Sequence, residues 1–428
     1  MRSGGESRSS PELGFARVLD GDGAAVSEDF GRPREGEGHG ASPTRYAARR
    51  LMLYLDHAAT TPMRPEARAA MEPWLGDGFG NPSGIHEVSR RAKHALEDAR
   101  ERAAGMLGAA HPLDIVFTGG GTGSDNLGVA GPALAGDRRG GVITTAIEHE
   151  AVLETARFLE RLGCPLTVIG VDGDGLADPA RVAAAVIPAT AVVSVMAANN
   201  ETGARQPLQA IAAAVHAAGP AVVHTDAVQA FVSEEVTAQA LGADLITLAS
   251  HKFGGPKGVG LLLAPREIPL EPVLHGGGQE LERRSGTHNV AGIIGMVAAM
   301  EAAAADRERF RTDVGEARRR FEESLAGAVE GFSVNGPLDA RLVQHSHVRF
   351  PGVSAETLLI LLDGLGLGAS AGSACNSGAI AVSPVLAAMG MGPIEASECV
   401  RFSFGWTTRP EDGDAAAAMV LEALASLR

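Results

Sequence analysis

Cysteine, aromatic residues and positive charge are all scarce in this chain. Three cysteines among 428 residues are too few for a disulfide framework or a zinc site, and they fit a reducing compartment. Aromatic residues make up only 4% of the chain. Because 37 basic residues face 52 acidic ones, the net charge is −15, which argues against a nucleic-acid-binding or anionic-membrane-binding surface. Small molecules or proteins are the expected partners.

Long hydrophobic runs are also missing. No run approaches the roughly 18 uninterrupted apolar residues of a membrane helix, and the N-terminus lacks the apolar stretch of a secretory signal. We therefore expect a cytoplasmic protein that makes no membrane contact and holds no metal. Glycine, in contrast, is abundant at 55 residues, about 13% against a usual ~7%. This excess suggests loops in which backbone geometry does work that side chains do elsewhere.

The N-terminal segment differs in composition from everything after it. Gly, Ser and Pro supply 18 of its first 50 residues, eight arginines balance eight acidic residues, and no apolar periodicity appears. We predict a disordered extension over 1–51. The eight acidic residues argue against a transit peptide. Met52 leaves open that the extension is an appendage or reflects a misplaced translation start.

Short apolar or β-branched runs alternate with helical patterns from residue 53 onward. They predict seven strands, at 114–118, 141–145, 166–169, 191–196, 221–225, 245–248 and 258–263. These runs are apolar along their whole length, and helical patterns such as 90–107 separate them. The arrangement is typical of a mostly parallel seven-stranded sheet that is covered on both faces.

The pattern changes at about residue 310. A charged helix is predicted around 306–328, a strand at 345–350 and an amphipathic helix near 413–427. We therefore predict an α/β protein of two domains, which matches its length. A large domain would span 64–308, and a smaller α+β domain would combine 53–63 with 309–428.

Ligands of an open parallel sheet bind at the carboxyl ends of its strands. After the strand at 114–118 the chain reads Gly-Gly-Gly-Thr-Gly-Ser-Asp-Asn over 119–126, a loop that opens a helix and suits a phosphate group. It matches neither G-x-G-x-x-G nor a P-loop, so a nucleotide is not the expected occupant. A plain flexible turn is the alternative.

Asp226 and Lys252 follow two further predicted strands. The lysine is followed closely by glycines and lies 26 positions beyond the aspartate. This pattern is typical of a pyridoxal phosphate site, in which the amine forms a Schiff base and the carboxylate keeps the pyridine nitrogen protonated. Either residue alone would more often be a surface charge. The combination with a phosphate loop is what makes the pattern specific.

Two more reactive side chains occupy informative positions. His149 follows the strand at 141–145, where it could stack on a cofactor and move protons; a structural histidine is the alternative. Cys375 lies in a stretch of small residues that suits an exposed loop carrying a nucleophile. Cys164 and Cys399 fit buried positions better.

A serine hydrolase is excluded in spite of a matching pentapeptide. Residues 368–372 fit G-x-S-x-G, with Ser370 at the nucleophile position. The last histidine in the chain is His347, so no histidine follows the serine as the order of that triad requires.

Taken in order, the motifs of this chain closely resemble those of the cysteine desulfurases of the NifS/IscS type. That family consists of pyridoxal phosphate enzymes of fold type I, in the class V aminotransferase group. The resemblance runs from about Leu53 to the C-terminus. It rests on the motifs at 54–62, 79–83, 118–126, 148–149, 199–203, 224–229, 251–252, 284–287, 372–375 and 401–403.

The resemblance implies roles for thirteen residues. Lys252 would bind pyridoxal 5'-phosphate covalently, His149 would stack above its ring and shuttle protons, and Cys375 would be the persulfide-forming nucleophile. The further cofactor contacts would come from Gly121, Thr122, Asn200, Asp226, Gln229, Ser250, His251 and Thr287. Of these, Thr287 would reach in from the other subunit of a homodimer. Asn81 and Arg401 would bind the substrate carboxylate.

The implied reaction converts L-cysteine to L-alanine. Sulfur would remain on Cys375 as a persulfide for an acceptor protein, either an iron–sulfur scaffold or a tRNA-thiolating enzyme. A selenocysteine lyase or another pyridoxal phosphate-dependent C–S lyase would share the fold without needing Cys375. A non-catalytic scaffold for sulfur-transfer proteins is the alternative from another class.

The chain departs from the family pattern at two positions. Gly123 stands where the family commonly has a glutamate at the start of the helix. Before the lysine the family usually has Ser-Gly-His or Ser-Ala-His, whereas this chain has Ala249, Ser250 and His251. One hydroxyl is thus shifted by a position, and we expect Ser250 or His251 to compensate for it.

Overall fold

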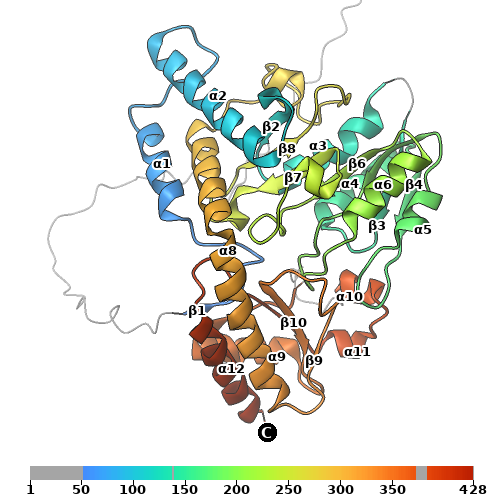
Figure 1. The fold of residues 1–428 in the computed structure, drawn as a ribbon, viewed down its shortest axis with the longest axis vertical. Coiled ribbons are helices and arrows are strands. Elements are labelled where there is room, and N and C mark those ends of the chain that lie inside the picture. Colours follow the sequence, from blue (N-terminus) through green and yellow to red (C-terminus); the bar gives the residue numbers. More distant parts are fainter. Residues whose placement is uncertain (1–51, 137–138, 373–382, 428) are drawn as a thin grey trace, which may run out of the picture. The chain divides into compact units, whose positions relative to one another are not determined.

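The computed structural model describes residues 52–136, 139–372 and 383–427 (Figure 1). The predicted extension at 1–51 and Cys375 both lie outside these ranges. Within them, no helix is long and apolar enough to cross a membrane.

A seven-stranded sheet forms the centre of the fold. Its order is β2 (Ile115–Thr118), β8 (Gly260–Leu263), β7 (Leu245–Ala249), β6 (Val222–Asp226), β5 (Thr190–Ser194), β3 (Gly141–Thr145) and β4 (Leu166–Ile169). Only β8 runs antiparallel to its neighbours. The predicted α/β class and its mostly parallel seven-stranded sheet are confirmed, with every strand within two residues of its expected bounds. The other six strands therefore end at one edge of the sheet.

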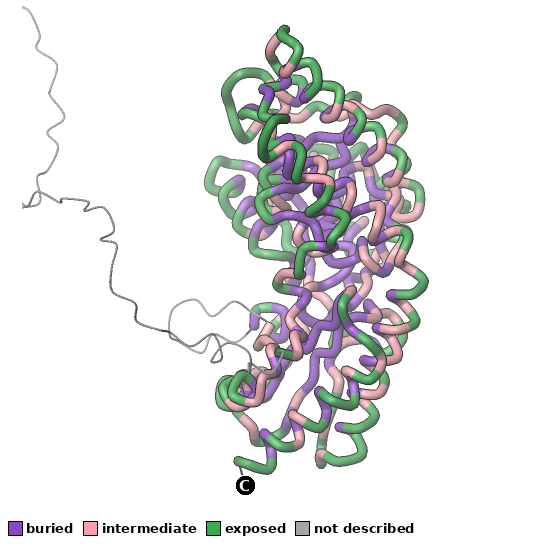
Figure 2. Tube along the Cα trace, turned by 90° about the vertical axis from the view of Figure 1, so that its left-hand side faces the viewer, coloured by how far each residue is buried: buried purple, intermediate pink, exposed green. Residues whose placement is uncertain are grey.

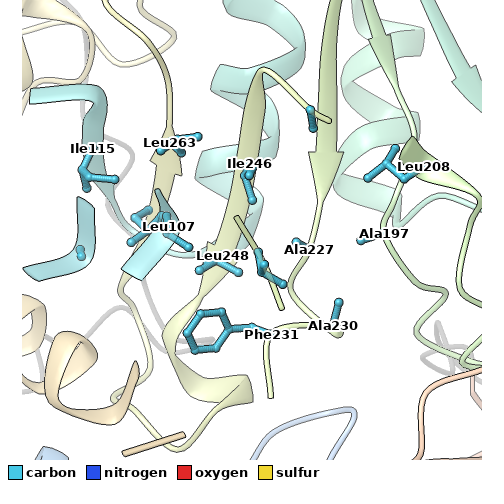
Figure 3. Packing of buried hydrophobic residues seen from close by; sticks show 14 of the residues in the cluster. Leu107, Ile115, Ala197, Leu208, Ala227, Ala230, Phe231, Ile246, Leu248 and Leu263 are labelled. Carbon is cyan, nitrogen blue, oxygen red and sulfur yellow. The ribbon is translucent and has the colours of Figure 1, made fainter. Parts of the chain in front are cut away.

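Helices cover both faces of this sheet. One face packs on α1 (Pro65–Leu75), α2 (Glu87–Leu107), α5 (Pro179–Ala184), α6 (Leu208–Ala218), α7 (Ala238–Leu241) and α8 (Val290–Ala326), and the other on α3 (Gly121–Leu134) and α4 (Glu150–Arg161). Figure 3 shows the first face, where Ile246 and Leu248 of β7 pack near Leu107 and Phe231. Alternate residues such as Leu245 point into the second core. Figure 2 shows the resulting buried band.

A second, smaller core lies in the C-terminal part of the chain. An antiparallel sheet orders β12 (Cys399–Ser403), β10 (His345–Arg349) and β9 (Ser333–Val334), and β1 (Leu53–Tyr54) pairs in parallel with β11 (Leu367–Gly368). Four helices accompany these strands: α9 (Ala355–Leu365), α10 (Pro384–Ala388), α11 (Pro393–Ala396) and α12 (Pro410–Ala425). Leu55 belongs to the same core as Phe402. The N-terminal strand is thus built into the C-terminal part.

Helix α8 connects the two cores without a break. Its first half packs in the core of the large sheet and its second half in the C-terminal core, alongside α12 (Figure 1). The charged helix expected at 306–328 is therefore the second half of α8. The expected domain boundary at 308 falls inside this continuous helix, and the division into two domains stays a prediction.

Candidate active site

A cavity of about 380 Å³ opens where the carboxyl ends of the parallel strands meet. Its wall is built from the strand ends, from the first turns of α3 and α4, and from residues of the C-terminal part. Nine of the thirteen residues singled out in the sequence line it: Gly121, Thr122, His149, Asn200, Asp226, Gln229, His251, Lys252 and Arg401. Residues that are up to 280 positions apart in the sequence thus share one site.

One end of the cavity is the start of α3. The helix begins at Gly121 and has no side-chain cap, so its first N–H groups are available to an anion. Gly120, just before it, has φ +139°, a conformation that residues with a Cβ rarely adopt. A side chain at Gly121 would also crowd Ala249, at 3.1 Å from its Cβ. The glycines therefore bring the helix start close to the end of β7.

Lys252 lies directly behind this helix start. The 3-10 helix η3 (Ser250–Lys252) follows β7, and Lys252 Nζ donates hydrogen bonds to the carbonyl oxygens of Ala58 and, at 3.0 Å, of Ala59. Burial and the positive charge of Arg401 lower the pKa of the Lys252 amine to about 8. A usable fraction of the amine is therefore neutral, as a nucleophile or a base must be.

Asp226 ends β6 in the depth of the cavity. It is 7% exposed, and its Oδ1 accepts a hydrogen bond from the Val228 N–H at 2.9 Å. Burial raises its pKa, while His149 and Lys252 act in the opposite direction. The site thus holds a carboxylate whose charge is poorly solvated, and a cationic ligand atom would stabilise it.

Asp125 and Glu148 bring two further carboxyl groups to the cavity wall, and the sequence reasoning missed both. Burial, reinforced by the charge of Asp226, raises the pKa of Asp125 well above its usual value and that of Glu148 to about 8. Glu148 Oε1 accepts hydrogen bonds from Thr145 Oγ1 at 2.6 Å and Met196 N at 2.9 Å. At pH 7, Glu148 is therefore largely protonated, and all three carboxyl groups of the site hold a proton more tightly than they would in water.

Two histidines flank the amine. His149 caps α4, and its Nδ1 accepts the Ala151 N–H at 3.1 Å, so the neutral ring carries its proton on Nε2. His251 Nδ1 lies 3.1 Å from Thr60 Oγ1. Burial and the charge of Lys252 lower the pKa of His251 to about 4, and it is neutral at pH 7.

Arg401 brings a buried positive charge from β12 to the opposite wall. Its Nη2 donates to Asp56 Oδ1 at 2.6 Å and its Nη1 to the Asn200 carbonyl at 3.0 Å. The side chain is 4% exposed. Such a guanidinium can bind a carboxylate with two parallel hydrogen bonds. Nearby, Gln229 Nε2 donates to the Ala58 carbonyl at 3.0 Å.

Asn81 and Thr287 do not line the cavity. Both are exposed. Asn81 lies in the connection between α1 and α2, where its Oδ1 accepts the Ser83 N–H at 3.0 Å. Thr287 lies just before α8. Their predicted roles in cofactor and substrate binding therefore stay predictions.

Ser250 does not line the cavity either. It is fully buried, and its Oγ has no hydrogen-bond partner among the described residues. A Cβ on Gly255 would lie 2.1 Å from that oxygen, so the hydroxyl is turned toward Gly255. Ala249 occupies the cavity wall instead. The expected compensation by Ser250 stays a prediction that this geometry does not favour.

Glu201 is a further lining residue that the sequence reasoning missed, although it directly follows Asn200. Its Oε2 accepts a hydrogen bond from Ser383 Oγ at 2.6 Å. Gly372 and Pro384 also line the wall. Cys375 itself lies outside the described residues, but the chain on both sides of it borders the cavity.

The two described cysteines are poor candidates for a nucleophile. Cys164 packs in the core between α4 and β3, and Cys399 lies in β12. Burial raises the pKa of both thiols, that of Cys399 to about 11. Neither forms a thiolate readily near pH 7.

Comparisons with known proteins agree on one family. Residues 53–415 match the family described as aminotransferase class-V. The cysteine desulfurase IscS of Dictyoglomus turgidum is 41% identical over 362 residues, which cover 84% of this chain and 91% of that protein. A solved NifS-like protein is 32% identical with a TM-score of 0.82, over 88% of this chain and all of that one. The structure of SspA in complex with cysteine is 33% identical with a TM-score of 0.72, over 82% and 98%.

Proposed function

This chain belongs to the aminotransferase class-V family and is a cysteine desulfurase of the IscS/NifS type, and we propose that Lys252, His149 and Cys375 are its catalytic residues. The observation that carries the proposal is the convergence of an amine with a lowered pKa, a buried carboxylate and an uncapped helix start in one cavity. No single motif requires that convergence. It unites residues from at least four elements around one ligand-sized space.

The family implies pyridoxal phosphate. The residues of the cavity suit three parts of that molecule: its phosphate group, its ring nitrogen and the carbon that an amine would attack. Its phosphate group would lie at Gly121, Thr122 and His251, with Ser250 as a weaker candidate. Asp226 would hold its ring nitrogen protonated, and Lys252 would carry it covalently. We assign the remaining contacts as the resemblance implies: His149 to the ring face, and Asn200 and Gln229 to the ring hydroxyl.

The residues of the chain supply binding and proton transfer. When bound, pyridoxal phosphate supplies an electron sink for the α-carbon of the substrate. Arg401 orients the substrate carboxylate, and this carboxylate competes with Asp56 for the guanidinium. Asn81, which lies outside the cavity, would have to move toward it to bind the same carboxylate. The neutral amine of Lys252 or the imidazole of His149 moves the α-proton.

Sulfur transfer needs a thiolate, and we assign it to Cys375. Its sulfur attacks the sulfur of L-cysteine, so that an S–S bond forms as the C–S bond breaks. The electron pair of the broken bond stays with the carbon, which takes up a proton. L-Cysteine and the Cys375 thiol therefore become L-alanine and a Cys375 persulfide, with no external oxidant or reductant.

The partners follow from the same assignment. Exposed Thr287 would complete the phosphate site of a second subunit, which makes the protein a homodimer. The persulfide would pass to an acceptor protein, and an iron–sulfur scaffold and a tRNA-thiolating enzyme are both suitable acceptors.

Mass spectrometry after treatment with L-cysteine tests the proposal. We expect one additional sulfur atom on the peptide that contains Cys375, together with release of alanine. Cys375→Ala should lose both, whereas Cys164→Ala, which alters a cysteine in a separate core, should keep them.

Two other outcomes would contradict the role of Cys375 or the catalytic function. Undiminished sulfide and alanine release by Cys375→Ala in the presence of a reductant would favour a selenocysteine lyase or another C–S lyase. A protein that binds neither pyridoxal phosphate nor cysteine would be a scaffold.

A further inference from the structure

The segment 276–289, which we call the Thr287 loop, has an unusual backbone. It contains the short turn η4 (Glu280–Glu282). Glu280, Leu281 and Glu282 have φ values of 53°, 56° and 65°. Three consecutive non-glycine residues in the left-handed region are rare, because each Cβ crowds its own backbone there. Contacts elsewhere must therefore hold this loop in shape.

Those contacts centre on the carboxylate of Glu280, whose side chain is fully buried. Arg100 of α2 donates to both oxygens, at 2.7 and 2.9 Å. His288 Nε2 lies 2.7 Å from Oε1, and the Phe117 N–H donates to Oε2 at 3.1 Å. Burial would raise the pKa of Glu280, but the bonds to His288 and Arg100 lower it to about 2. The carboxylate is thus ionised at any pH at which the protein works.

Arg100 is itself held firmly. Its Nη1 also donates to the Ile115 carbonyl at 2.6 Å, and its guanidinium lies 4.9 Å from the centre of the Phe117 ring. Ile115 and Phe117 both belong to β2, the strand that leads into the glycine loop at 119–121. The Glu280 carboxylate therefore joins the Thr287 loop to α2 and to the strand that positions the chain's own phosphate site.

His288 connects this network to the residue that is predicted to act on a second subunit. It directly follows Thr287, which is exposed and lies outside the cavity of its own chain. Glu280 therefore connects the turn at 280–282 to His288, so that Thr287 lies in the segment between the two ends of this contact.

We propose that Glu280 is a positioning residue that acts across the subunit interface: it holds the loop in the shape in which Thr287 reaches the cofactor phosphate of the partner subunit. This inference rests on the proposed function, in which Thr287 acts on a second copy of this chain. Arg100 and His288 hold the carboxylate in place. Although the carboxylate also binds β2 of its own chain, the proposal requires that a change at Glu280 affect the site of the partner more than the site of its own chain.

Hybrid dimers test this direction. Two differently tagged chains are co-expressed, and one carries Lys252→Ala so that only one cavity is competent. In the first hybrid, Glu280→Gln is on the same chain as Lys252→Ala, and the competent cavity receives the altered loop. In the second, Glu280→Gln is on the other chain, and the competent cavity receives an unaltered loop. The reference hybrid carries Lys252→Ala alone.

The measured quantity is the affinity of the competent cavity for pyridoxal phosphate. We expect it to fall about tenfold in the first hybrid, as for loss of a hydrogen bond to a charged group, and to change less than about twofold in the second. Equal losses in both hybrids would mean that Glu280 only stabilises its own chain, and would overturn the proposal.

Two further variants keep the test decisive. His288→Gln, a milder change of the same network, replaces Glu280→Gln if the latter chain does not fold, and the same asymmetry is expected. Thr287→Ala in the same two hybrids tests the proposed function by itself. If the loss of cofactor affinity caused by Thr287→Ala differs between the two hybrids, and the loss caused by Glu280→Gln or His288→Gln does not, only the present inference fails. If Thr287→Ala shows no asymmetry, or the protein is a monomer, the trans role of the loop fails with it.

Discussion

The residues that the motifs assign to the site fall into two regions of contrasting structure. Asp226 is buried and Lys252 half-buried near the strand ends, and both are hydrogen-bonded to their own chain. Asn81 and Thr287 are exposed on loops and touch nothing in the cavity. The contrast shows that a motif indicates the chemistry of a residue but not whether its side chain lines the cavity of its own chain. The packing of the chain determines this, and substitutions in each of the two regions test it.

The largest expected difference is between Lys252 and Thr287. Lys252→Ala should lower turnover by at least about 10³-fold, because it removes both the covalent attachment and a proton-transfer group. Thr287→Ala should lower cofactor affinity about tenfold, which corresponds to one hydrogen bond to a charged group. Turnover assays at saturating cofactor separate the two, since only the second loss is restored.

A covalent label checks the first half of this comparison directly. The chain has only three lysines, Lys93, Lys252 and Lys257. After borohydride reduction of the cofactor-loaded enzyme, peptide mapping should find the label on Lys252. A label on Lys257, which is exposed, would contradict the buried site.

The sequence predicted the buried region well because two strong signals coincide there. Largely apolar runs indicated all seven strands, and polar residues that follow some of these runs closely, namely His149, Asp226 and Lys252, marked the edge of the sheet. The sequence could not predict the pairing of Asp56 with Arg401, since 345 positions separate them and the segment around Asp56 meets β12 only in the folded chain, where it pairs with Ser403. Nor did it predict that α8 runs through the expected boundary at 308, because a charged second half resembles a separate helix.

Burial of Glu148 near the strand ends makes the stability of the fold depend on pH. The pKa of Glu148 is raised from 4.5 to about 8 in the folded protein. Between these values the folded state holds a proton that the unfolded state releases. The stabilisation is therefore complete below about pH 4.5 and is lost as the pH rises through 8. Glu148→Gln cannot release that proton.

Urea unfolding of the cofactor-free protein at pH 6 and pH 8 measures this effect. The unmodified chain should lose about 1–2 kcal/mol more than Glu148→Gln over this interval, since one shifted group contributes at most about 1.4 kcal/mol per pH unit. Glu154→Gln, an exposed change on α4, is the matched control and should behave like the unmodified chain. If the free energy of unfolding changed equally between pH 6 and pH 8 for the unmodified chain and both variants, Glu148 would be ionised in the folded protein.

The smallest expected effect concerns Ser250, which is fully buried directly after β7. The sequence assigned its hydroxyl to the phosphate, but the side chain is turned toward Gly255 and Ala249 faces the cavity. We therefore expect Ser250→Ala to change cofactor affinity by less than about twofold, because it removes no contact to the cavity. Ala249→Ser is the matched variant, and its hydroxyl should strengthen binding several-fold if the phosphate lies there. Equilibrium titration with pyridoxal phosphate compares both. A clear loss in Ser250→Ala would mean that the hydroxyl turns into the cavity when the cofactor binds, and the strand-end region would then be less rigid than its burial indicates.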